Sequence, residues 1–88
     1  MPMRIFRDDG PPAPHAMYQH SDRRWWCVDK CAVVADTEKA VLVHSDGTDE
    51  PYWLPKSQLH EDDNECWEEG DEGTLVFSAW IGRQKGWL

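Results

Sequence analysis

Apolar residues are concentrated in four stretches that follow residue 24. The first is the long stretch WWCVDKCAVVA at residues 25–35, and the others are KAVLVH at 39–44, YWL at 52–54 and TLVFSA at 74–79. Aromatic and β-branched residues of this kind favour strands. The dipeptide Asp46-Gly47 between the second and third stretches is a strong hairpin signal. The pattern predicts three consecutive strands and a fourth that follows a longer loop.

The last nine residues, WIGRQKGWL, favour a short helix, although Gly82 and Gly86 lower its helix propensity. Four residues at spacings of three or four would lie on one face of that helix: Trp80, Gln84, Trp87 and Leu88. We therefore expect a mainly β (α+β) fold. The architecture we expect first is a small, strongly bent antiparallel sheet or an SH3-like or OB-like partial barrel, with a short C-terminal helix. The second choice is an α+β meander capped by the same helix.

The chain divides into an arm and one domain. Residues 1–22 contain Gly10, Pro11, Pro12 and Pro14, which disfavour both helix and central strand. We expect residues 1–22 to form an extended N-terminal arm and residues 23–88 to form a single small β-rich domain. Four residues of the arm could tie it to that domain: Ile5, Phe6, Met17 and Tyr18. The N-terminal residues lack the apolar stretch of a signal peptide, which predicts a cytoplasmic location in a host cell.

Negative charge narrows the range of partners. The 88 residues include 17 Asp and Glu against 9 Lys and Arg, a formal net charge of −8. Binding to the phosphate backbone depends on Lys and Arg, so this balance makes nucleic acid an unlikely partner. No apolar run approaches the ~20 residues that a membrane span needs, so we expect no membrane association.

An acidic run and a set of tryptophans are the candidate binding surface for a partner protein. EDDNECWEEGDE, residues 61–72, contains eight acids and no base, and six tryptophans are many for this length. Such a run is typical of a solvated loop that maintains solubility, or of a surface that occupies a basic groove on a partner. We place Trp53 and Trp80 in the core and expect other tryptophans to be interface anchors. The predicted partner-binding residues are Trp25, Trp26, Glu61, Asp62, Asp63, Glu65, Trp67, Glu68, Glu69, Asp71 and Glu72.

Cysteine and histidine provide a weaker alternative, a zinc-stabilised domain. The chain has Cys27, Cys31 and Cys66 together with His15, His20, His44 and His60. The C-x₃-C spacing suits zinc, but on a straight strand the two cysteines lie about 13 Å apart, so they could share an ion only if the chain bends at residues 28–30. We interpret the cysteines as small core residues and predict no metal and no cofactor. The metal alternative would use Cys27, Cys31, Cys66 and His44.

Catalytic motifs are missing from the sequence. It has no G-x-S-x-G, H-E-x-x-H, P-loop or G-x-G-x-x-G pattern, and we predict a protein that is not an enzyme, with no catalytic residues. A second alternative is a small barrel that binds single-stranded nucleic acid. It would use stacking on Trp25 or Trp26 and four basic residues: Arg23, Arg24, Lys30 and Lys56.

The segment 38–88 resembles a group of short acidic proteins encoded by bacteriophages and prophages, most of them without an assigned activity. The resemblance rests on KAVLV, a DG turn, WLPKSQL, an acidic loop, GTLVFSAWI and a final KGW. It implies a phage context, in which small acidic proteins often bind a host protein, as anti-defence and anti-CRISPR inhibitors do. The expected partner is therefore a host or phage protein.

Self-association is a further expectation, since an open sheet has edges that must be covered or paired. We expect the strand at residues 25–35 to be such an edge and include a homodimer among the predicted partners.

Overall fold

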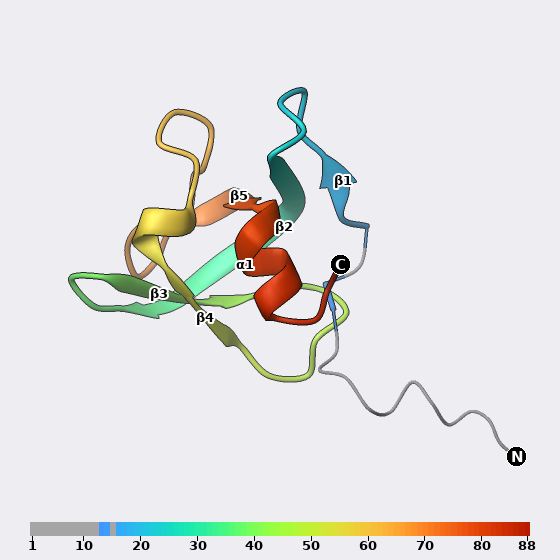
Figure 1. The fold of residues 1–88 in the computed structure, drawn as a ribbon. Helices are drawn as coiled ribbons and strands as arrows, with labels where there is room; N and C mark the ends of the chain where they lie inside the picture. The colour runs from blue at the N-terminus through green and yellow to red at the C-terminus, as the bar shows by residue number, and fades with distance from the viewer. Residues whose placement is uncertain (1–12, 15) are drawn as a thin grey trace, which may run out of the picture.

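The computed structural model describes residues 13–14 and 16–88, and these form one antiparallel sheet with a short C-terminal helix (Figure 1). The predicted mainly β fold class is thereby confirmed, and the sheet does not close into a barrel. In chain order the elements are β1 (Tyr18–Gln19), β2 (Trp25–Asp36), β3 (Ala40–His44), β4 (Tyr52–Pro55), the 3₁₀ helix η2 (Lys56–Gln58), β5 (Glu72–Ser78) and α1 (Ala79–Gln84).

Strand β2 is the centre of the sheet. It pairs with β5 along one edge, while β1 and β3 share its other edge, and β4 lies beyond β3. The prediction that residues 25–35 form a sheet edge is therefore wrong. The physical reason is the length of this twelve-residue strand, which leaves room for both β1 and β3 on one edge. Its apolar residues are also suited to a strand that has neighbouring strands on both sides.

Strand β2 bends strongly in the middle. Its register against β5 shifts between Val28 and Cys31, and Lys30 has a φ of 61°. The Asp29 carboxylate fastens the bend, because its Oδ1 accepts hydrogen bonds from the Tyr18 hydroxyl (2.8 Å) and the Thr74 hydroxyl (2.9 Å). This carboxylate raises the pKa of Tyr18 to about 12. One side chain thus connects β1, β2 and β5.

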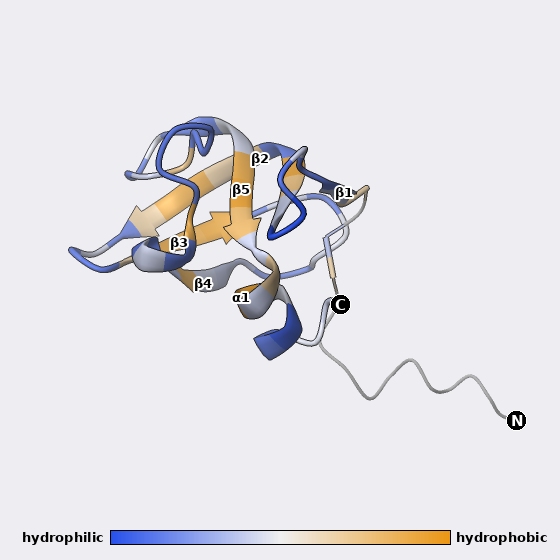
Figure 2. Cartoon of the chain, turned by 45° about the horizontal axis from the view of Figure 1, so that its top comes forward, coloured by the Kyte–Doolittle hydropathy of each residue, from blue (hydrophilic) through white to orange (hydrophobic). Residues whose placement is uncertain are grey.

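The hydrophobic core lies between the bent sheet and α1. Figure 2 shows β2, β3 and β5 as the apolar strands and the connecting loops as mainly hydrophilic. The Ser78 hydroxyl caps α1 by accepting from the Ile81 amide, and the buried Trp87 ring meets Tyr52 and Phe77 edge-on. The core cluster consists of Val28, Cys31, Val33, Val41, Val43, Leu54, Leu59, Cys66, Leu75, Phe77, Ile81 and Trp87.

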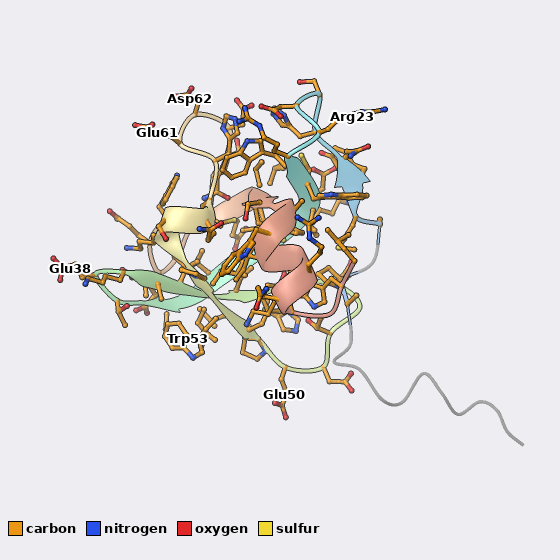
Figure 3. The ribbon with its side chains drawn as sticks, in the orientation of Figure 1. Arg23, Glu38, Glu50, Trp53, Glu61 and Asp62 are labelled. Carbon is orange, nitrogen blue, oxygen red and sulfur yellow. The ribbon has the colours of Figure 1, made fainter. Side chains whose placement is uncertain are left out.

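Two tryptophans that we placed in the core are on the surface instead. Trp53 is 45% exposed and Trp80 is 53% exposed, so both predictions are wrong. In β4 the neighbouring Leu54 takes the inward position, and strand alternation turns Trp53 outward (Figure 3). In α1 the buried residues are Ile81 and Gly82, while Trp87 reaches the core from beyond the end of the helix, so Trp80 is left on the outer side.

Part of the predicted arm belongs to the sheet. Tyr18 and Gln19 pair with Cys27 and Trp26, and Met17 packs against the core. Residues 1–12 and 15, which include Ile5, Phe6 and His15, lie outside the described residues. The boundary between arm and domain at residue 22 stays a prediction. Among the described residues, no helix has the length and apolar character to cross a membrane.

Candidate functional site

The first half of the acidic loop (residues 61–72) is hydrogen-bonded to the sheet. After η2 the chain runs along the outer edge of β5, where Leu59 bridges Phe77. The His60 amide donates to the Val76 carbonyl (2.9 Å), and the Glu65 amide donates to the Thr74 carbonyl (2.9 Å). The loop therefore covers a sheet edge that would otherwise present unpaired backbone groups.

Asn64 holds this half of the loop in place. It is the residue in the acidic run whose polar side chain is buried, with 5% exposed. Its Nδ2 donates to the Cys66 carbonyl (2.9 Å), and its Oδ1 accepts from the Val76 amide (2.9 Å). Both ends of the side-chain amide are thus satisfied, as burial of a polar group requires.

Cys66 and Trp67 are the apolar anchor of the loop. Cys66 is completely buried in the core, while Trp67 is half-buried and packs against the same cluster. The Trp67 indole N–H donates to the Asn64 carbonyl (2.8 Å). The indole therefore stabilises its own loop and leaves only part of its ring for a partner.

The second half of the loop is fixed by Asp71. Its Oδ2 accepts from the backbone amides of Trp67 (3.0 Å) and Glu68 (2.9 Å), and these hydrogen bonds lower the pKa of the Asp71 carboxyl. Backbone hydrogen bonds from Val33 to Asp71 (2.8 Å) and from Gly70 to Val33 (3.0 Å) join the loop to β2. The acidic loop is therefore an ordered part of the fold.

The carboxylates of this loop differ in what they do. Glu65 accepts from the Thr74 amide (2.7 Å), Asp71 closes its own turn, and Asp63 contacts His20. The remaining acids of the run are exposed, and within the described part of the chain their carboxylates accept no hydrogen bond: Glu61, Asp62, Glu68, Glu69 and Glu72. Figure 3 shows Glu61 and Asp62 pointing outward from the tip of the loop.

A histidine cluster lies beside the acidic loop. His20 Nε2 is 2.6 Å from Asp63 Oδ2, His60 Nδ1 is 3.9 Å from the same oxygen, and the two imidazole centroids are 4.9 Å apart. Trp25 packs edge-on against His60 with centroids 4.8 Å apart. Sequence reasoning named these residues separately but did not bring them together, because the two histidines are forty positions apart and no spacing motif connects them.

Trp25 and Trp26 are both half-buried. Trp25 covers the histidine cluster, while Trp26 packs against the main core. Each has part of its ring available at the surface, and the more exposed tryptophans are Trp53 and Trp80.

The cysteines are buried free thiols. Burial raises the pKa of Cys31 to about 11 and that of Cys66 to about 12, and burial with the nearby Asp29 charge raises the pKa of Cys27. A raised pKa keeps each thiol protonated and unreactive at neutral pH. Within the described residues, the ligand atoms that converge as a group of three belong to His20, His60 and Asp63, and the thiols and the exposed His44 are not among them.

The four basic residues of the nucleic-acid alternative are partly neutralised by acids. The Arg24 side chain makes two hydrogen bonds to Asp22 and the Arg24 backbone amide makes a third, and together they lower the pKa of that carboxyl to about 2. Lys56 lies 3.5 Å from Asp36. Arg23 and Lys30 are exposed, and Figure 3 shows Arg23 in the connection between β1 and β2. Two of the four cations therefore have a carboxylate partner within the domain.

Fold and surface together define a small antiparallel β domain that presents an ordered acidic loop. Comparison with protein-family models, with curated proteins and with solved structures gives no match to this chain. The function is therefore inferred from the chemistry of the surface.

Proposed function

We propose that the protein is a non-enzymatic interaction protein of the phage or prophage type, which binds a host or phage protein through the acidic loop. Inhibition of a host defence system, as by anti-CRISPR proteins, is the form of this function that we propose first. Two half-buried tryptophans, Trp25 beside the loop and Trp67 within it, would add apolar contact area.

The order of the acidic loop is the observation that supports this proposal. A run of acids that serves solubility alone needs no fixed conformation, since charge and hydration are sufficient. Here Asn64, Cys66 and Asp71 hold a self-repelling segment against β5 and β2. Carboxylates that are already positioned lose little conformational entropy on binding, which favours affinity for a partner.

The chemistry of the loop indicates a basic partner surface. Exposed carboxylates attract Lys and Arg, speed association through long-range steering and select against acidic partners. A groove that normally holds a nucleic-acid backbone fits this description, because it presents cations at phosphate spacing. We therefore propose a partner protein whose binding surface is a basic groove.

The test is affinity capture from lysate of the bacterial host, with and without nuclease, followed by mass spectrometry. The wild-type protein is compared with the triple variant Glu61→Lys, Asp62→Lys and Glu68→Lys, in which every substituted side chain is exposed. Asp71 is left unchanged because its hydrogen bonds close the loop. We expect one near-stoichiometric, nuclease-resistant protein with the wild type and loss of that protein with the variant.

A matched control changes the net charge equally at another place. Asp46→Lys, Asp49→Lys and Glu50→Lys alter three exposed acids of the β3–β4 loop, and this variant should capture the same protein. Equal capture by wild type and both variants would contradict binding through the acidic loop. Captured material that disappears with nuclease would favour nucleic-acid binding instead.

A further inference from the structure

The histidine cluster has the composition of a metal site. One ligand atom each from His20, His60 and Asp63 lies within 4.8 Å of the others. The two histidine side chains are largely buried, with 17% and 19% exposed, whereas Asp63 is 52% exposed. We propose that these three residues bind one divalent transition-metal ion of the Zn²⁺ class.

The ligand set determines the class of ion. Two imidazole nitrogens and one carboxylate suit Zn²⁺, Co²⁺, Ni²⁺ or Cu²⁺, whereas Mg²⁺ and Ca²⁺ prefer oxygen ligands throughout. Tetrahedral Zn²⁺ with bonds of about 2.0–2.1 Å places its ligand atoms about 3.3 Å apart. The separations from Asp63 Oδ2 to His20 Nε2 (2.6 Å) and to His60 Nδ1 (3.9 Å) lie on either side of that value. The ligand nitrogens of His20 and His60 lie within 4.8 Å of each other, so the two rings must approach by up to about 1.5 Å to share one ion.

Backbone amides orient both rings. The Asp62 and Asp63 amides donate to His60 Nδ1 (3.2 and 3.1 Å), so this nitrogen is unprotonated and its lone pair is occupied. An ion at Nδ1 must displace both amides. The Asp22 amide donates to His20 Nδ1 (3.0 Å), so a neutral His20 carries its proton on Nε2, facing Asp63. An ion at Nε2 displaces that proton, and the neutral ring then carries a proton on Nδ1. The Asp22 amide must therefore turn away when the ion binds.

Three protein ligands leave a coordination position for water or for a further ligand. An open pocket of about 330 Å³ lies next to His20 and Asp63 and is also lined by Tyr18, Glu65 and Thr74. Asp63 is 52% exposed and lines this pocket together with His20, so the ion would be accessible from solvent. Asp63 is the one ligand that belongs to the acidic loop, and the variant that tests partner binding leaves it unchanged, so the two proposals can fail separately.

Titration of the full, tag-free and reduced chain with ZnCl₂ tests the proposal, using calorimetry together with amide NMR spectra. We expect one equivalent of Zn²⁺ to bind and the Asp22 amide resonance to move. His20→Ala should lower the affinity at least about tenfold. Asp63→Asn, which preserves the shape of the side chain, should do the same if His20→Ala fails to fold.

His44→Ala is the matched control, because it removes an exposed histidine that lies outside the cluster. Its Zn²⁺ affinity should equal that of the wild type. The proposal is overturned if the wild type binds no Zn²⁺ or if binding survives both His20→Ala and Asp63→Asn. Loss of binding with Cys27→Ser while the cluster variants still bind would assign the ion to the thiols and overturn it equally.

Discussion

Asn64 is the residue on which the order of the acidic loop depends most. Its two hydrogen bonds, to the Cys66 carbonyl and from the Val76 amide, tie the loop to β5 from a buried position. In the sequence it looks like an uncharged residue that merely interrupts a run of acids. Its importance comes from burial, which a single sequence does not reveal.

We predict that Asn64→Ala destabilises the protein by about 2–3 kcal/mol, because it leaves a buried amide and a buried carbonyl without partners. Urea unfolding monitored by tryptophan fluorescence measures this loss. Asp62→Ala in the same loop is the control and should change stability by less than about 0.5 kcal/mol, since its side chain is exposed. Equal stability of the two variants would show that Asn64 does not anchor the loop.

At the scale of elements, the long strands and the helix were predictable because their local composition is unambiguous. The predicted strand 74–79 corresponds to β5 at Glu72–Ser78, and the predicted strand 25–35 to β2 at Trp25–Asp36. Strand β1 has only two residues and both are exposed, so no hydrophobic pattern marks it. Pairing order is a non-local property, and this is why β2 was expected at an edge although it is the central strand.

The candidate site was predictable in part. The acids of the loop were identified from composition, and their exposure agrees with a solvated run, but the fixed backbone of the loop depends on contacts with β5 and β2. The cluster of His20, His60 and Asp63 forms only because the bend of β2 and the path after η2 bring distant segments together. Neither feature has a local signal in the sequence.

At the scale of the whole molecule, the buried thiols couple stability to pH. The pKa values of Cys31 and Cys66 are raised to about 11 and about 12, above the ordinary value of a thiol. A thiol whose pKa is higher in the folded state than in the unfolded state contributes to the free energy of unfolding. This contribution is fully present below the unfolded-state pKa and is lost as pH rises through the folded-state pKa. Stability should therefore fall from about pH 9 toward pH 11–12.

We predict a loss of about 1–2 kcal/mol for each of these two thiols by about pH 10, because ionisation favours the unfolded chain. Urea midpoints measured under reducing conditions at a series of pH values provide the test. Cys66→Ala is less stable at neutral pH but should show a shallower decline above about pH 9. The same steepness in the wild type and Cys66→Ala would contradict the role of the Cys66 thiol.

The most direct test of the central claim, that the acidic loop is an ordered part of the fold, is amide hydrogen exchange in residues 61–72 of the wild-type protein. The Glu65 and Gly70 amides donate to the backbone of β5 and β2. They should exchange at least about 100-fold more slowly than the same amides in an unstructured peptide. Exchange at the rate of a free peptide throughout the loop would contradict the claim and remove the support for a preorganised binding surface.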